Sequence, residues 1–579
     1  MTTNVMIAIG CIALIVAYGV VLLIISNRDS KFAKGNAENF YVGGRGVSFI
    51  PMLGTLLMSL MSVLVIIGYP AGMYRNGIGY YSGIVGVMMA AGLYLPICYR
   101  LWLLGKKYHY VTPTDFFYHR FRSKPFALLL SILYVICIIP YISVQVKGVA
   151  DYLSTATSGL FGYWVVVFVF LIYIGFHTIN GGNKSVTNTD AFAGYCAIGT
   201  LIIMVLVYMN KYVGSTSMGE VVDTILNSEN ANALQKSAAY DSPIEVFGFG
   251  LATGGCLLSW PHFMQRAFMA KSGKVMRFSS MGIAIGYVVI MGCCVLFGSF
   301  IGPYAFPGLD SVSAENLMSM LAVNAAPAMA CVLGLAAFAF GLSTADSFVV
   351  TATSLIQHNI VPTQKEKIVS HSKWWIIGTL VAVLLVNYFQ PPILTDYAYT
   401  FCTPGFAQLC PALFLGLFWK RATKEGALAG LIVGMIGCFY TAFINNPIPS
   451  VHVILWGLIP NIIVFVVVSL LTKPDKQAAD EIVIPLHEHF APTSRRAGFK
   501  VTMVLMLGIL VLSYIICPYI PSDSFVGWMP TLHIAQQSCG ILWAVFAFLY
   551  YKYRICAPDG VELNEGELRI PERDITSRQ

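Results

Sequence analysis

The chain has 579 residues, of which 57% are hydrophobic and only 11% are charged, whereas an ordinary soluble domain has roughly 25% charged residues. This composition argues against a soluble protein and indicates a polytopic membrane protein. The formal net charge of +8 does not imply a nucleic-acid partner, because most basic residues lie in short loops between apolar runs. The 14 cysteines lie mostly inside apolar runs and form no CxxC pair, so we expect no zinc or disulfide framework.

Fifteen apolar runs are long enough to cross a bilayer. The first is not a cleaved signal peptide, because no basic residue precedes it and Arg28 and Lys31 follow it. The predicted spans are residues 5–26, 48–73, 80–104, 125–148, 162–180, 189–209, 244–264, 279–301, 327–357, 374–390, 393–419, 425–443, 451–472, 499–520 and 533–553.

The basic residues give these spans an orientation. Alternate loops, from 27–47 to 552–579, hold 31 of the 35 lysines and arginines, and the remaining four are Arg75, Lys147, Lys211 and Lys236. By the positive-inside rule, the N-terminus is predicted outside and the C-terminus in the cytoplasm. We expect a multi-pass protein of the cell membrane, with a bacterial inner membrane as the best fit.

The loops are too short for a separate catalytic domain, because domains rarely fall below about 50 residues. Only the predicted extracellular loop 210–243 and the cytoplasmic loop 473–498 exceed about 25 residues. No HExxH or GxSxG motif occurs inside a span. We therefore predict that the chain is not an enzyme and that it acts within the membrane.

The run 327–357 is interrupted near its middle by Ser343, Thr344, Asp346 and Ser347. On a helix these residues form an oxygen-rich patch, and an ionisable group at that depth is by default a functional hypothesis. Oxygen ligands without Cys or His suit a hard cation, so we suspect a Na⁺ site. The alternative is that the hydroxyls bond to carbonyls one turn earlier and that Asp346 pairs with a neighbouring helix.

Six motifs, in order and suitably spaced, resemble those of the sodium:solute symporter family, the first of them made of two stretches. They are YVGGRG with Gly43, Gly44 and Arg45, then Tyr69-Pro70-Ala71-Gly72, YVTPTDFFYHRFR at 110–122, GGNKSVTNTD at 181–190, PHFMQRAFMAKS at 261–272, LSTADS at 342–347 and GLFWKRATKEGALAG at 416–430. The resemblance implies an all-α membrane fold with a leucine-transporter-like core of five plus five inverted repeats and discontinuous helices at the midplane.

On this basis the chain divides into a leading helix and cytoplasmic loop, two repeats and accessory helices. The predicted boundaries are 1–47, 48–209 for the first repeat, the extracellular loop 210–243, 244–419 for the second repeat, 420–553 for four accessory helices and the tail 554–579. Glycines and Pro261 weaken 248–262 as a continuous helix. We expect 248–256 to be unwound, with close helix packing as the alternative role of the glycines.

The resemblance also implies the ion ligands. The common sodium site would use the carbonyls of Met58, Met61 and Phe340 and the hydroxyls of Ser343 and Thr344. A second cation site, for Na⁺ or H⁺, would use Asp190, Asp346 and Ser347. Whether it exists is open, because Asp346 stands where the two-sodium pattern has serine and because Asp190 could simply cap a helix.

The solute is predicted less specifically. Thr55, Ser59, Ser62, Gly254 and Gly255 would line the pocket at the broken spans. Gln145 and Lys147 could attract an anionic solute, although Lys147 could instead snorkel to the interface. Trp260 and His262 are predicted to be structural.

The predicted function is secondary active transport that couples inward Na⁺ flow to uptake of a small organic solute, with a monomer as the functional unit. The loop 110–122 and the span with PYISVQ look most like the family's monocarboxylate branch. The alternatives are H⁺ coupling, a different solute such as an amino acid, pantothenate or a sugar, an uncoupled channel, and a transporter-like sensor.

Overall fold

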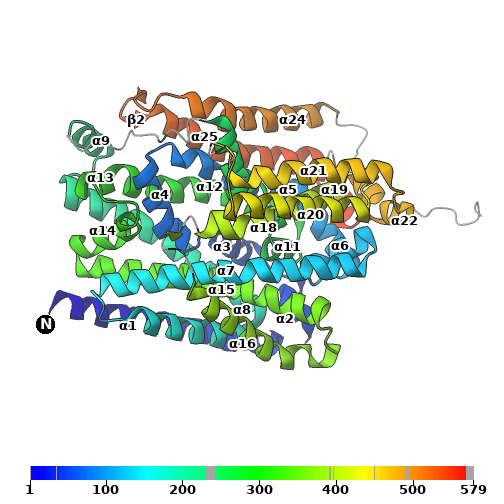
Figure 1. Ribbon diagram of the computed structural model, residues 1–579, viewed down its shortest axis with the longest axis horizontal. Helices are drawn as coiled ribbons and strands as arrows, with labels where there is room; N and C mark the ends of the chain where they lie inside the picture. The colour runs from blue at the N-terminus through cyan, green and yellow to red at the C-terminus, as the bar shows by residue number, and fades with distance from the viewer. Residues whose placement is uncertain are drawn as a thin grey trace, which may run out of the picture.

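The computed structural model is built almost entirely of long helices, as the apolar runs predict. It describes residues 2–568 except 34, 35, 229–236, 238–241, 390, 392, 395, 396, 449, 491–495 and 558. Parts of the predicted loop 210–243 and of the tail 554–579 therefore lie outside the described residues. The long helices run along a common direction, with α1 and α16 on one side of the molecule and α24 and α25 on the other (Figure 1).

The helices of the first half are α1 Thr3–Ala33, α2 Ala37–Val42, α3 Phe49–Leu60, α4 Tyr69–Asn76, α5 Tyr80–Tyr108, α6 Pro113–Phe121, α7 Lys124–Ala156, α8 Tyr163–Tyr208, α9 Met218–Leu226, α10 Pro243–Gly250, α11 Pro261–Ala267 and α12 Gly273–Val295. The later ones are α13 Gly302–Ala305, α14 Leu317–Ala325, α15 Pro327–Leu355, α16 Ile368–Asn387, α18 Thr403–Ala407, α19 Cys410–Phe418, α20 Lys424–Phe443, α21 Val453–Leu471, α22 Lys476–Ala478, α23 Ile484–His489, α24 Arg496–Val511 and α25 Thr531–Tyr550. Two short strands, β1 Phe525–Val526 and β2 Met529–Pro530, form an antiparallel hairpin.

The described residues contain twelve helices that are long and apolar enough to cross a membrane, and a bent pair that could form a thirteenth span. Two segments account for the difference from the fifteen predicted spans. Pro243–Ser259 is apolar but short. Tyr163–Val213 is one unit of 51 residues, although about 20 residues suffice to span the bilayer. Gly182, with φ 57° and ψ −168°, breaks that unit at a conformation that glycine adopts readily, so fifteen remains the predicted number.

The peripheral helices expose apolar side chains to the surroundings, as lipid-facing helices do. On α1, Val16 and Ile24 are 59% and 64% exposed, whereas Ile7, Cys11 and Leu22 on the same helix are buried against the core. In contrast, α5 is buried on nearly all sides. α15 packs against α1, α7 and α8, and α3 packs against α8, α12 and α15. The predicted all-α membrane fold is confirmed, and the segment from Phe340 to Ser347 is buried within it.

Candidate sodium and solute site

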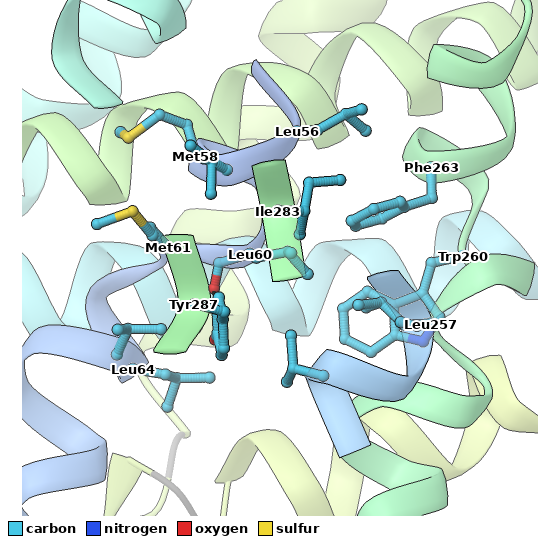
Figure 2. Packing of buried hydrophobic residues seen from close by; sticks show 14 of the residues in the cluster. Leu56, Met58, Leu60, Met61, Leu64, Leu257, Trp260, Phe263, Ile283 and Tyr287 are labelled. Carbon is cyan, nitrogen blue, oxygen red and sulfur yellow. Dashed lines mark hydrogen bonds between the residues drawn. The ribbon is translucent and has the colours of Figure 1, made fainter. Parts of the chain in front are cut away.

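The predicted break in the second span is present between α3 and the π-helical turn Leu64–Gly68 that leads into α4. The two halves are bent by 53°. The backbone hydrogen bonds of α3 end with one from Met61 N to Leu57 O (2.9 Å), and those of the next helical segment begin with one from Val65 N to Ser62 O (2.9 Å). The last carbonyls of a helix have no intrahelical partner. Tyr287 Oη donates to Leu60 O (3.3 Å), as Figure 2 illustrates. The Leu60 carbonyl is therefore bonded already, and the carbonyls of Met58 and Met61 at this helix end are left for a cation.

Val63 fixes this break against α15. A Cβ atom added at Gly148 of α7 would lie 1.9 Å from Val63 Cγ1, and one added at Gly341 of α15 would lie 3.1 Å from Val63 Cγ2. These distances are below a normal carbon contact, so only glycine leaves room for the valine at both positions. The fit brings the open end of α3 beside Gly341, next to Phe340 in the sequence and one turn from Thr344.

The hydroxyls of Ser343 and Thr344 stand out from the others on α15. Their side chains are 4% and 1% exposed, and neither oxygen has a hydrogen-bond partner among the described residues. In contrast, Ser347, Thr351 and Thr353 donate to carbonyls one turn earlier at 2.7, 2.7 and 2.8 Å. Buried polar atoms are normally satisfied. The alternative of back-bonding therefore holds for the later hydroxyls, and the first two have the properties of cation ligands.

Asp190 and Ser347 belong to one buried network organised by Arg266. Its Nη2 atom lies 3.1 Å from Asp190 Oδ2 and 2.6 Å from Ser347 Oγ, and its Nε atom donates to Thr55 Oγ1 (2.9 Å). The Thr55 hydroxyl donates in turn to Asp190 Oδ2 (2.6 Å). Asp190 and Arg266 are each 2% exposed, so the pair is charge-compensated in the interior. The Asp190 carboxylate also lies beside Ser343, without the geometry of a hydrogen bond.

Asp346 lies in a different pair. Its carboxylate contacts His177 Nδ1 and accepts a bond from Thr178 Oγ1 (2.9 Å), both on α8. His177 and Asp346 are 5% and 1% exposed. The structure thus divides the three predicted members of the second cation site between two pairs. Asp346 pairs with a neighbouring helix, as the alternative predicts. His177 could not be recognised from the sequence, because its partner is 169 residues away.

The predicted solute residues fall into two groups. Three lie at the break, where Gln145 Oε1 accepts from Val63 N (3.1 Å), Ser62 Oγ accepts from Leu64 N (3.2 Å) and Ser59 Oγ donates to Thr55 O (2.5 Å). The others have different neighbours. Thr55 joins the Arg266 network, and Lys147 pairs with Asp151 at 2.5 Å.

The glycines of the seventh predicted span serve helix packing. A Cβ added at Gly254 would lie 1.5 Å from Gly86 O of α5, and one added at Gly255 would contact Met89 and Leu251. The chain stays helical through the π-turn Leu251–Gly255, so the expected unwinding of 248–256 was wrong. The extended residue is Trp260, with φ −68° and ψ 138°, because a residue before proline is driven out of the helical region.

Trp260 and His262, predicted to be structural, adjoin the break through an aromatic cluster. The ring of Tyr141 lies 5.0 Å from that of Trp260 and 5.1 Å from that of Phe348, and the ring of Phe406 lies 4.8 Å from that of Trp260. Figure 2 shows Trp260 across from Met58 and Met61, on the far side of Tyr287. The signal in the sequence was an indole and an imidazole beside a helix-breaking proline, and that signal alone does not distinguish packing from binding.

Two discontinuous segments meet a continuous helix at a buried patch of carbonyls and hydroxyls, an arrangement typical of membrane transporters with broken helices at the midplane. The family model described as "Sodium:solute symporter family" matches residues 40–434. The chain belongs to that family.

Known relatives and a solved structure agree with this family assignment. The uncharacterized symporter YodF of Bacillus subtilis (strain 168) is 25% identical over 79% of this chain and 92% of its own. The sodium/pantothenate symporter of Escherichia coli (strain K12) is 25% identical over 78% and 94%, and a sodium/proline symporter of Staphylococcus aureus (strain JH9) is 26% identical over 79% and 92%. The outward-open, substrate-bound structure of a Na⁺-coupled sialic acid symporter matches with a TM-score of 0.67 and 18% identity. The match covers 80% of this chain and 98% of the symporter chain.

The predictions of family, of a multi-pass membrane protein and of Na⁺ as the coupling ion are thereby confirmed. The chain is a secondary transporter and not an enzyme, and it takes up a small solute together with sodium. Its terminal orientation, its ion ligands and its solute remain predictions.

Proposed function

We propose that this chain couples Na⁺ entry to uptake of a short-chain monocarboxylate. Na⁺ is held by the carbonyls of Met58, Met61 and Phe340 and by the hydroxyls of Ser343 and Thr344. The observation that carries the sodium site is the pair of buried, unpartnered hydroxyls beside an interrupted helix. Five oxygen atoms without a full charge suit a hard cation that must be released in each cycle.

A carboxylate solute is supported by the charges near the break. The carboxylates of Asp190 and Asp346 are engaged with Arg266 and His177, and the Gln145 carbonyl oxygen is taken by Val63 N. Among the described residues, Gln145 Nε2 and Trp260 Nε1 are buried there without a hydrogen-bond partner, and both are donors, which suit an anionic group. Proline, pantothenate and sialic acid, named for the relatives and the structural neighbour, are also all carboxylic acids.

The energy available from Na⁺ entry depends on the charge of the solute that crosses with it. A cation crossing about 100 mV gains roughly 2.3 kcal/mol, and this term cancels when a monoanion crosses with one Na⁺. A tenfold Na⁺ gradient then supplies about 1.4 kcal/mol. Uptake of a monocarboxylate with one Na⁺ is therefore electroneutral, and its accumulation follows the Na⁺ gradient alone.

The test is uptake by proteoliposomes of labelled pyruvate, lactate, acetate, proline and pantothenate, under an inward Na⁺ gradient or with K⁺ replacing Na⁺. Wild type is compared with Ser343→Ala and with a matched control, Thr353→Ala, whose hydroxyl is bonded within α15. We expect Na⁺-driven uptake of a monocarboxylate that is lost in Ser343→Ala and kept in the control. Uptake that is indifferent to Na⁺ and driven by a proton gradient would refute the sodium site.

A further inference from the structure

A cavity of about 390 Å³ lies between α8, α12 and α25, and residues of α9 and of the β1–β2 hairpin also line it. It therefore lies near the end of the bundle that carries α9 and β2 (Figure 1). Its volume is that of a small-molecule site. The described residues that line it are apolar except for Trp528, His533 and Gln537, and none of them is charged. Such a lining suits an apolar chain with one small polar group.

The rim of the cavity faces hydrocarbon. Ile202 and Leu206 of α8 and Val289 of α12 line it and are 43%, 45% and 38% exposed. All three lie within predicted membrane spans, where the surroundings of an exposed side chain are acyl chains. Trp528, also in the lining, precedes the last predicted span and is 40% exposed, as is typical of tryptophans at the membrane–water interface. The cavity thus lies at the depth of a lipid headgroup and the first part of its chain.

Gly292 of α12 leaves part of this cavity open. A Cβ atom added at Gly292 would have one close neighbour among the described residues of other segments, Gln537 Nε2 at 3.4 Å. α12 and α25 pack against each other, yet at this position there is room for a side chain. The amide of Gln537 therefore lies at the inner wall of the cavity, opposite the missing side chain.

His533 and Gln537, one helical turn apart on α25, form a polar pair in this wall. Gln537 Nε2 lies 3.3 Å from His533 Nε2, whereas Gln537 Oε1 and His533 Nδ1 are buried without a hydrogen-bond partner among the described residues. If the amide NH₂ donates to the imidazole, a neutral His533 keeps an N–H donor and Gln537 keeps an oxygen acceptor. If the amide is turned round, the donor and the acceptor exchange places. In both cases the pair lacks one acceptor and one donor.

A hydroxyl group is the small group that satisfies such a pair, because it donates through its hydrogen and accepts through its oxygen. An ammonium group carries donors only, and it would leave the donor of the pair unmatched. A phosphate group has no lysine or arginine to bind it among the described residues of the lining. Leaving a buried polar group without a partner is costly, so an occupant with a hydroxyl group is favoured over one without.

We propose that this cavity binds a membrane phospholipid with a glycerol headgroup. One acyl chain lies against the apolar side chains of α8 and α12, and a headgroup hydroxyl bonds to His533 and Gln537. The ring of Tyr81 on α5 lies 5.4 Å from the imidazole of His533 and packs against it. The site is separate from the sodium site and does not depend on which solute the protein carries.

The bound lipid would contact the helix that supports the break. Tyr287 of α12 donates to Leu60 O at the end of α3, and the next two residues, Val288 and Val289, line the cavity. A chain packed against these valines therefore touches the same turn of α12 that holds the end of α3.

The test is photo-crosslinking of the purified protein in detergent. The probes are phosphatidylglycerol and phosphatidylethanolamine with identical acyl chains that carry a diazirine, and labelled peptides are identified by mass spectrometry. We expect phosphatidylglycerol to label the α8, α12 and α25 residues of the cavity at a lipid concentration on the order of fivefold to tenfold lower than phosphatidylethanolamine, as one additional hydrogen bond predicts.

Two kinds of variant separate the cavity from its polar pair. Gly292→Leu fills the cavity and should abolish this labelling, whereas Gly378→Leu, at a glycine of α16 with open space around it, should leave it unchanged. The double variant His533→Phe with Gln537→Leu should still be labelled but should no longer distinguish the two lipids. The comparison of the two lipids on the wild type needs no variant, so a variant that fails to fold does not remove the test.

Equal labelling of the wild-type cavity by both lipids would overturn the recognition of a hydroxyl group. Absence of labelling in α8, α12 and α25, or unchanged labelling of a folded Gly292→Leu variant, would overturn the lipid site itself. Cross-links between the cavities of two copies of the chain, in place of lipid labelling, would also overturn it and would assign this face to a contact between copies.

Discussion

Replacing Arg266 with glutamine removes the cation that compensates Asp190 in the centre of the molecule. The two groups are 3.1 Å apart and almost fully buried. In the variant Arg266→Gln, Asp190 keeps the Thr55 hydroxyl as a donor but loses its counter-charge, and Ser347 loses its bond to the guanidinium. The variant Asp190→Asn leaves the guanidinium uncompensated in the same way.

The expected cost follows from the burial of both groups. Removing one partner of a buried ion pair costs about 3 to 5 kcal/mol, whereas replacing both by neutral groups is far less destabilising. The double variant Asp190→Asn with Arg266→Gln should therefore be more stable than either single variant. The coupling between the two substitutions, which is the sum of the two single losses minus the loss in the double variant, should then be about 3 kcal/mol or more.

The assay is thermal unfolding of the purified protein in detergent, followed by tryptophan fluorescence for wild type, both single variants and the double variant. We expect both single variants to unfold at a lower temperature than the double variant. Additive losses, with the double variant least stable, would show that the two residues do not form a compensated pair and would refute this reasoning.

Three further predictions concern the ion site. Gly341→Ala introduces overpacking at the break and is expected to weaken the apparent Na⁺ affinity on the order of tenfold. This affinity is measured as the Na⁺ concentration that gives half-maximal uptake. The control Gly378→Ala should leave it unchanged, because Gly378 has open space around it. Asp346→Asn should retain Na⁺-dependent uptake, because Asp346 pairs with His177; complete loss of Na⁺ dependence would place Asp346 at the ion. Replacing Na⁺ by K⁺ should lower the unfolding temperature of the wild type, since Na⁺ at about 100 times its Kd stabilises the folded protein by about 2.7 kcal/mol. The variant Ser343→Ala should unfold at the same temperature in both salts. A difference between the salts that persists in this variant would contradict the assignment of the sodium site.

The sequence was sufficient to predict the membrane class and most element positions. Long apolar runs and the distribution of 31 basic residues depend only on local composition, which the bilayer constrains strongly. The break after Leu60 followed from the family resemblance and is present. The second break was expected at 248–256 and lies at Trp260 instead, because four glycines at 248–255 suggested unwinding where the structure uses them for close helix packing, Gly254 against Gly86 of α5 among them.

The partners of the buried charges could not be predicted from one sequence. Asp190 and Arg266 are 76 residues apart, and His177 and Asp346 are 169 apart. Their pairing depends on how α8, α11 and α15 pack, and no periodicity within one span encodes it. The sequence identified Asp190 and Asp346 as unusual but joined them in one site, whereas packing gives each its own counter-group. The unpartnered nitrogens of Trp260 and His262 likewise become visible only once their neighbours are known.

Direct measurement of sodium binding to the purified protein is the sharpest test of the central claim that Ser343 and Thr344 hold the coupling ion. Equilibrium binding of radioactive ²²Na⁺ needs no knowledge of the solute. We expect saturable binding in wild type and in the Thr353→Ala control, and loss of that binding in Ser343→Ala. Unchanged ²²Na⁺ binding by a folded Ser343→Ala variant would contradict the assignment of the sodium site to this turn of α15.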